Sequence, residues 1–214
     1  MFSPTQSEIF YTCAAFFLLG LYHLYWIYQI RYNPLATSVG ITNHLRGHWV
    51  EHVMEEKLDI LAVQTLRNWV MASSFLASTG IIICLGLLSV AASPEKMAEI
   101  TPSLDELVRE HRVLWLFKLM VLIIDFFFIF FSFCLAIRYF NHVNFMINVP
   151  TSLDHKISPK YITEILNTGM MHYTMGMRGY YIAVLLFLWL FGPIWMLMGT
   201  VIMIIVLYHL DRKA

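Results

Sequence analysis

The stretch that decides the fold is VLWLFKLMVLIIDFFFIFFSFCLAIRYF, residues 113–140. Nearly all of its side chains are apolar, and its charged residues are Lys118, Asp125 and Arg138. A helix needs about 20 mostly apolar residues to cross the hydrocarbon core of a bilayer. The stretch therefore predicts a membrane-spanning helix.

Three further stretches have the same character, at about residues 9–30, 68–91 and 179–208. The first ends in several tyrosines and Trp26, which is typical of an aromatic belt at a membrane surface. The last contains Gly192-Pro193, and a proline inside a helix predicts a kink. We expect four spanning helices.

Composition supports this interpretation for the whole chain. Of the 214 residues, 59% are hydrophobic and 13% are charged, with a formal net charge of zero. Soluble domains carry about 45–50% apolar and about 25% charged residues. A soluble enzyme is therefore excluded, and the absence of a basic block argues against a partner nucleic acid. Catalytic signatures such as GxSxG, HExxH and the Walker A loop are also missing.

The predicted fold class is all-α, a single membrane domain over residues 1–214 with one or two amphipathic helices at the membrane interface. In HLRGHWVEHVMEEKLDILAVQTL, apolar residues recur every three to five positions, which predicts such a helix over about 43–66. A second is predicted in SLDELVREH (103–111), where Ser103 and Glu106 have the spacing of a capping box.

Four spans would place both termini on one side of the membrane and the segments 31–67 and 141–178 on the other. These two segments hold a slight excess of Lys and Arg, which favours a cytoplasmic location in a cell or inner membrane. The tail sequence RKA argues for the opposite orientation.

Polar residues lie near the span ends on the side of these two segments. Because arginines facing lipid are costly, we expect them to gather into a structural network or a site for an anionic lipid headgroup. Separate snorkelling of each side chain to the interface is the simpler alternative. The candidate residues are Arg31, Arg67, Asn68, Arg138, Asn141, His142, Arg178 and Tyr181.

The favoured function is therefore a non-enzymatic membrane protein, an accessory subunit of a larger complex or a homo-oligomer, with membrane lipids as partners. Small residues in the second stretch suit close helix packing and motivate self-association; they are Ala72, Ser73, Ser74, Ala77 and Ser78.

An oligomeric channel or transporter for anions or protons is the main alternative. Asp125 is the acid deepest in a span, and an ionisable group there suggests a proton or ion site. His23 is its expected partner. A protonated or hydrogen-bonded structural aspartate would explain the same residue.

Metal or haem binding is the second alternative. His44, His48 and His52 repeat every four residues on one helical face, where Glu55 could complete a zinc site. Met171, His172 and Met175 offer thioether and imidazole ligands for copper. Haem would need His23 opposite His142 or His172. A solvated helix face and adaptable apolar packing explain the same residues without a metal.

Several strings resemble a family of unknown function. They are AVQTLRN (62–68), MASSFLAST (71–79), SFCLAIRYFNHVNFMI (132–147), GMRGYY (176–181) and LWLFGP (188–193). Together they are similar to DUF599, over the chain from about Arg46 to the end. The resemblance implies a multi-pass helical membrane protein and supplies no activity.

Overall fold

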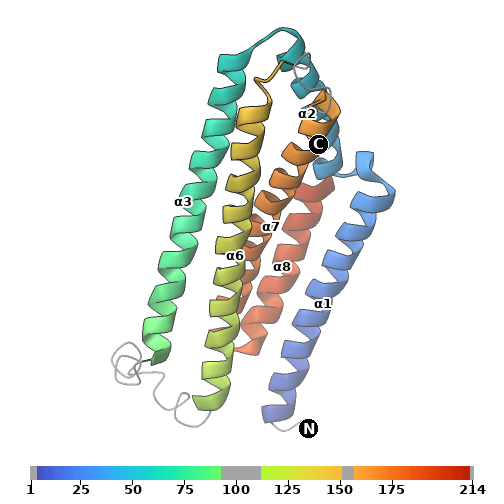
Figure 1. Ribbon diagram of the computed structural model, residues 1–214. Coiled ribbons are helices and arrows are strands. Elements are labelled where there is room, and N and C mark those ends of the chain that lie inside the picture. Colours follow the sequence, from blue (N-terminus) through green and yellow to red (C-terminus); the bar gives the residue numbers. More distant parts are fainter. Residues whose placement is uncertain (1–3, 93–111, 151–156, 213–214) are drawn as a thin grey trace.

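The computed structural model describes residues 4–92, 112–150 and 157–212, and within them it is entirely helical (Figure 1). A short 3-10 turn, η1 (Pro34–Ala36), joins the first two helices. The helices are α1 (Pro4–Tyr32), α2 (Ser38–Glu55), α3 (Asp59–Ala92), α6 (Arg112–Met146), α7 (Pro159–Phe191) and α8 (Pro193–Arg212). The predicted all-α class is confirmed.

Five stretches are long and apolar enough to cross a membrane, rather than the four expected from the sequence. They are Ser7–Tyr32, Asp59–Ala92, Val113–Met146, Pro159–Phe191 and Pro193–Arg212. The extra span arises because residues 179–208 do not form one kinked helix. Gly192 adopts φ 148°, a backbone conformation that favours glycine, and its N–H bonds the carbonyl of Trp189 at 3.2 Å. Helix α8 then folds back along α7.

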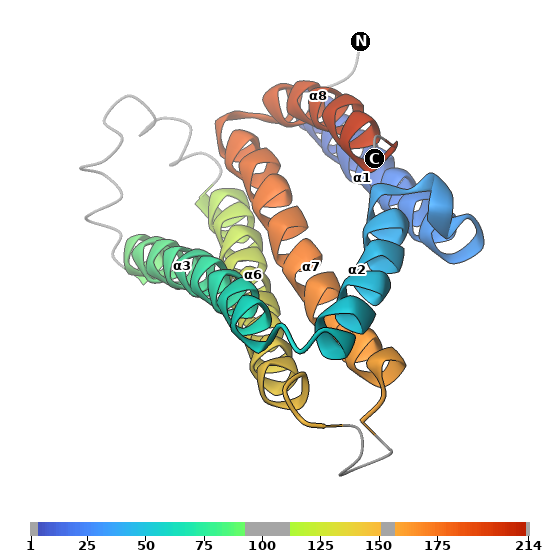
Figure 2. The same ribbon diagram turned by 90° about the horizontal axis from the view of Figure 1, so that it is seen from above.

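The odd number of spans also changes the expected placement of the termini. Helix α1 begins at one end of the bundle, and α8 finishes toward the opposite end (Figure 1). Four spans would instead have placed both at the same end. Seen from above, α6 lies between α3 and α7, and α1 pairs with α8 beside α7 (Figure 2).

The amphipathic helix expected over 43–66 is divided into two elements. Helix α2 ends at Glu55, and α3 begins at Asp59. Between them Lys57 has a positive φ of 53°, which stops the helix. The second amphipathic segment, at 103–111, lies outside the described residues.

Three of the helices are longer than a bilayer needs. At the usual helical rise, α3, α6 and α7 are each about 50 Å long, whereas the hydrocarbon core is about 30 Å thick. Helix α8 has 20 residues and matches that thickness. Because α8 turns back at Gly192, the surplus of α7 lies at its beginning. We call this end of the bundle the cap, comprising residues 34–70, 136–150 and 157–173.

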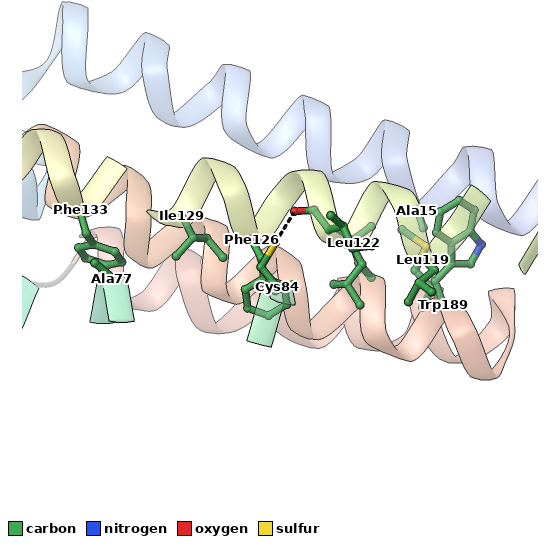
Figure 3. Close-up of a cluster of buried hydrophobic side chains, with 13 residues drawn as sticks. Ala15, Ala77, Cys84, Leu119, Leu122, Phe126, Ile129, Phe133 and Trp189 are labelled. Atoms are coloured by element: carbon green, nitrogen blue, oxygen red, sulfur yellow. Dashed lines mark hydrogen bonds between the residues drawn. The ribbon is translucent and has the colours of Figure 1, made fainter. Parts of the chain in front are cut away.

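The chain has one hydrophobic core in the cap and another in the rest of the bundle. The cap core joins Val50 and Val53 of α2 to Leu66, Phe140 and Ile162 on the three long helices. The other core lies mainly between α3, α6 and α7 and also includes Ala15 of α1 and Met196 of α8 (Figure 3). Burial of these side chains removes apolar surface from water in the cap, whereas close packing holds the helices together in lipid.

Helices α6 and α7 approach each other closely at two glycines. A Cβ on Gly176 would lie 2.7 Å from the ring of Phe133, and one on Gly179 would lie 2.5 Å from Ile129. Ser73 and Ala77 of α3 are buried inside the chain. These two small residues pack within the bundle, whereas Ser74 and Ser78 of the same predicted set are exposed on α3.

Candidate functional site

The most enclosed polar group, which we call the Arg178 cluster, consists of Tyr22, His23 and Trp26 of α1, Arg178 of α7 and Asp211 of α8. Arg178 is 5% exposed, and its Nη2 donates to both carboxylate oxygens of Asp211 at 2.7 and 2.6 Å. The guanidinium lies 3.6 Å from the ring centre of Trp26. The hydroxyl of Tyr22 also donates to Asp211. Three helices therefore meet at one ion pair.

Local sequence explains this placement. Leu19, Tyr22 and Trp26 are three and four residues apart and form the buried face of α1. The α7–α8 hairpin brings Asp211 to Arg178 although 33 residues separate them. An arginine at the edge of a bilayer needs such a partner, because hydrocarbon solvates a cation poorly.

Several polar atoms of the Arg178 cluster have no partner among the described residues. These atoms are Arg178 Nε and Nη1, Trp26 Nε1 and His23 Nε2. His23 Nδ1 lies 2.8 Å from the carbonyl of Leu19, so Nδ1 carries the proton and Nε2 is an acceptor in the neutral ring. Donors and an acceptor together suit a bridging water. A cavity of about 40 Å³ is large enough for water, and it borders Trp26 and Asp211 but not Arg178 or His23.

A second ion pair lies toward the opposite end of α1. Lys118 Nζ of α6 donates to Glu8 of α1 at 2.9 Å and lies 5.4 Å from the ring centre of Trp189. Trp189 Nε1 donates to Thr12 at 3.1 Å. Beside these residues is a cavity of about 360 Å³ between α1 and α6, lined mainly by apolar atoms. We call it the α1–α6 groove.

A third polar group joins α2 to α7 in the cap, and we call it the Arg46 cluster. Arg46 Nε donates to Asn167 of α7 at 2.8 Å, and Nη2 donates to Asn43 of α2. No carboxylate of the described residues forms an ion pair with Arg46. Burial lowers the pKa of Arg46 to about 10, so the side chain remains charged at neutral pH. Its cation is partly buried with neutral partners only.

Within the described ranges, no hydrogen bond or ion pair links the arginines expected to share one mouth. Arg31, Arg67 and Arg138 are exposed, and the described chain places no acid in ion-pair range of them. Tyr181 is half-buried. The remaining candidates Asn68, Asn141 and His142 are also exposed. Of this set, only Arg178 enters a polar cluster.

Asp125 and His23 are not partners either. Asp125 Oδ2 is buried and has no hydrogen-bond partner in the described part of the chain. The Lys118–Glu8 pair sets Asp125 level with Ala15, because α1 and α6 run in the same direction (Figure 1). His23 therefore lies about 12 Å further along the bundle.

The metal candidates lie apart from a complete ligand set. His44 Nε2 and His48 Nε2 are 3.3 Å apart, and His48 Nδ1 is 3.6 Å from Glu51, all on the exposed surface of α2. His52 and Glu55 are exposed. Across the described ranges, three or more His, Cys, Asp or Glu side chains do not gather into a metal-binding group.

The methionine-rich segment packs within the bundle. Met171 and Met175 are half-buried on α7. His172 stacks on Tyr139 with ring centres 5.4 Å apart, and His142 is exposed on α6. His23, His142 and His172 therefore do not form a facing pair for haem.

Sequence reasoning missed Asp211, Glu8 and the Arg46 cluster. Asn43 and Arg46 are three residues apart, which places them on one helical face and is a signal that the sequence does contain. Their partner Asn167 follows more than a hundred residues later and depends on how α2 packs against α7. That contact has no local signature.

Comparison with known proteins identifies the family and no activity. The sequence model of the family described as "Protein of unknown function, DUF599" matches residues 10–214, which includes nearly all of α1. No curated protein and no solved structure matches the chain. Because the match covers almost the entire sequence, the chain belongs to the DUF599 family.

Proposed function

We propose that this protein is a non-enzymatic multi-pass membrane protein that binds the phosphate of an anionic lipid at the Arg46 cluster. The observation that carries the proposal is a partly buried guanidinium with amide partners and no acid. The third nitrogen, Nη1, makes no hydrogen bond within the described chain. An arginine in this state is a good partner for a phosphate oxygen.

The position of the Arg46 cluster supports a lipid as the source of that phosphate. Asn167 lies near the beginning of α7, in the part of the helix that exceeds the bilayer thickness. The cap therefore reaches the depth of the headgroups. All Lys and Arg of the sequence except Lys96, Arg109, Arg112 and Lys118 belong to the cap end or to the segments joined to it.

This charge distribution favours a cytoplasmic cap by the positive-inside rule. With five spans, α8 ends at Arg212 toward the cap. Arg212 therefore no longer opposes the orientation that the segments 31–67 and 141–178 favour. A cytoplasmic leaflet rich in anionic lipid would face the Arg46 cluster.

The Arg178 cluster has a structural role in this proposal. Its charges neutralise each other, and its contacts tie α1 to the α7–α8 hairpin. It is the internal network, whereas the Arg46 cluster is the binding site.

The test is native mass spectrometry of the purified full chain with phosphatidylglycerol, phosphatidylcholine or inorganic phosphate. We expect Arg46→Gln to weaken phosphatidylglycerol retention about tenfold, the size of one lost charge-assisted hydrogen bond. Arg138→Gln is the matched control, because it removes an exposed arginine at the same end. An equal loss in both variants would show diffuse surface attraction. Saturable binding of inorganic phosphate without lipid preference would show a free anion site.

A small channel or transporter is the second candidate function, favoured by the unpartnered buried oxygen of Asp125. Ionisable groups inside spans commonly serve ion pathways. Proton flux into liposomes that is lost in Asp125→Asn would support it, and wild-type liposomes without flux would remove it.

A further inference from the structure

The α1–α6 groove has an unusual combination of walls. Ile9, Cys13 and Phe16 of α1 face Phe117 of α6, and Trp189 of α7 lies at the inner wall. Ile9, Cys13 and Phe117 are exposed at the surface of the bundle, so the groove opens toward lipid. Trp189 itself is 3% exposed. The volume of about 360 Å³ is within the range of small-molecule sites.

Two opposite charges lie beside the same groove. The side chains of Lys118 and Glu8 border it, with exposures of 8% and 27%, while the surface of the groove itself is almost entirely apolar. The Lys118 ammonium has three N–H donors, and Glu8 receives one of them. Glu8 is the second residue of the candidate span Ser7–Tyr32, so a membrane-spanning α1 would place it close to the headgroups. An apolar trough with a charged pair at this depth has the polarity pattern of an amphiphile.

We propose that the α1–α6 groove binds one phospholipid with a zwitterionic, primary-amine headgroup, of the phosphatidylethanolamine class. One acyl chain lies in the trough against Trp189. The lipid phosphate accepts a hydrogen bond from Lys118, and the lipid ammonium donates to Glu8. The two protein charges and the two lipid charges then alternate in sign.

Charge complementarity selects this headgroup over the other common ones. The carboxylate of Glu8 repels a headgroup that carries only negative charge. A quaternary ammonium, as in phosphatidylcholine, has no N–H to donate. This site lies at the opposite end of α1 from the cap, so it is independent of the anionic lipid proposed for Arg46.

Trp189 provides a native probe of occupancy. We would reconstitute the full chain in phosphatidylcholine vesicles that contain increasing fractions of phosphatidylethanolamine with brominated acyl chains. Bromine quenches tryptophan fluorescence at short range. The contribution of Trp189 is the difference between the wild type and Trp189→Phe. Trp195 of α8, which is 56% exposed, reports the bulk lipid through Trp195→Phe.

The expected result is saturable quenching of Trp189 at a low fraction of brominated lipid, while quenching of Trp195 follows the bulk fraction. Brominated phosphatidylcholine should need a fraction about tenfold higher, since it lacks the hydrogen bond to Glu8. Glu8→Gln should shift the phosphatidylethanolamine curve toward that of phosphatidylcholine. Cys13→Phe should abolish saturation by filling the groove. Because it leaves the Lys118–Glu8 ion pair in place, it can replace Glu8→Gln if that variant does not fold.

Two outcomes would overturn the inference. One is quenching of Trp189 that follows the bulk lipid as Trp195 does. The other is equal or stronger quenching by brominated phosphatidylcholine or phosphatidylglycerol. Arg46→Gln should leave Trp189 quenching unchanged, so failure here and failure of the proposed cap site can be told apart.

Discussion

An ion pair lies near each end of α1, and the two pairs differ in how completely they are enclosed. Arg178 and Asp211 have side-chain exposures of 5% and 19%, with two N–O contacts and an indole ring against the guanidinium. Lys118 and Glu8 have one contact and exposures of 8% and 27%, and they border an open groove. Both cations lie beside a tryptophan, at 3.6 Å and 5.4 Å from the ring centre.

The difference follows from the chemistry of the two cations. A guanidinium is planar, offers five donors and stacks on an aromatic ring, so it suits a closed site with fixed partners. An ammonium is a compact charge on a flexible stem, and it can take a new partner without losing the old one. We infer that the enclosed pair fixes the helices and that the open pair remains available to a ligand.

Removing one charge of each pair tests this difference most strongly. Arg178→Met leaves the Asp211 carboxylate without its cation, and we expect a loss of about 3–5 kcal/mol in unfolding free energy. Lys118→Met should cost about 1 kcal/mol, because Glu8 is more accessible. Reversible unfolding in detergent, followed by circular dichroism, measures both changes.

The control is the double variant Arg178→Met with Asp211→Leu, which removes both charges. It should recover most of the lost stability, because no charge is left unpaired. Equal losses of unfolding free energy in Arg178→Met and Lys118→Met would mean that the deeper burial of the Arg178–Asp211 pair does not make it more important for stability.

The comparison also requires that α7 keep its position against α6. Gly176→Ala introduces a Cβ 2.7 Å from the fully buried ring of Phe133, and we expect a loss of about 2 kcal/mol from overpacking. Arg178 follows Gly176 by two residues, so Gly176→Ala should disturb the Arg178–Asp211 pair more than the Lys118–Glu8 pair.

Gly86→Ala is the matched control for this glycine. A Cβ on Gly86 would have no neighbour within 4 Å, so the exchange should be neutral or slightly stabilising through helix propensity. Equal thermal unfolding curves for the two variants would contradict the close α6–α7 contact.

The spanning helices α3 and α6 could be predicted from the sequence because their apolar runs are bounded by polar residues. The α7–α8 turn could not be predicted from apolarity, since the residues around Gly192 are as apolar as the helices they join. Glycine followed by proline is a helix stop signal, and here it marks a turn rather than a kink. The missed turn changed both the number of candidate spans and the end of the bundle at which α8 finishes.

The candidate site was harder to predict for the same reason. Arg178 could be selected as a costly arginine near a span end, yet its partner Asp211 depends on the α7–α8 hairpin. The grouping of Arg178 with Arg67 and Arg138 used depth along the helices alone. That grouping did not consider which way each side chain points, and Arg67 and Arg138 are exposed in the structure.

Effects smaller than those of Arg178→Met and Gly176→Ala are expected from two hydroxyl groups that tie α1 to the bundle, one toward each end of the helix. Tyr22→Phe removes a hydrogen bond to the Asp211 carboxylate, and we expect a loss of about 1.5 kcal/mol. Thr12→Val removes the neutral acceptor of Trp189 Nε1 and should cost about 0.5–1 kcal/mol. Tyr28→Phe is the control, because Tyr28 is 54% exposed. If Thr12→Val proved more destabilising than Tyr22→Phe, α1 would be held more firmly beside the Lys118–Glu8 pair than beside the Arg178–Asp211 pair. Lys118 would then have a structural role rather than a role in ligand binding.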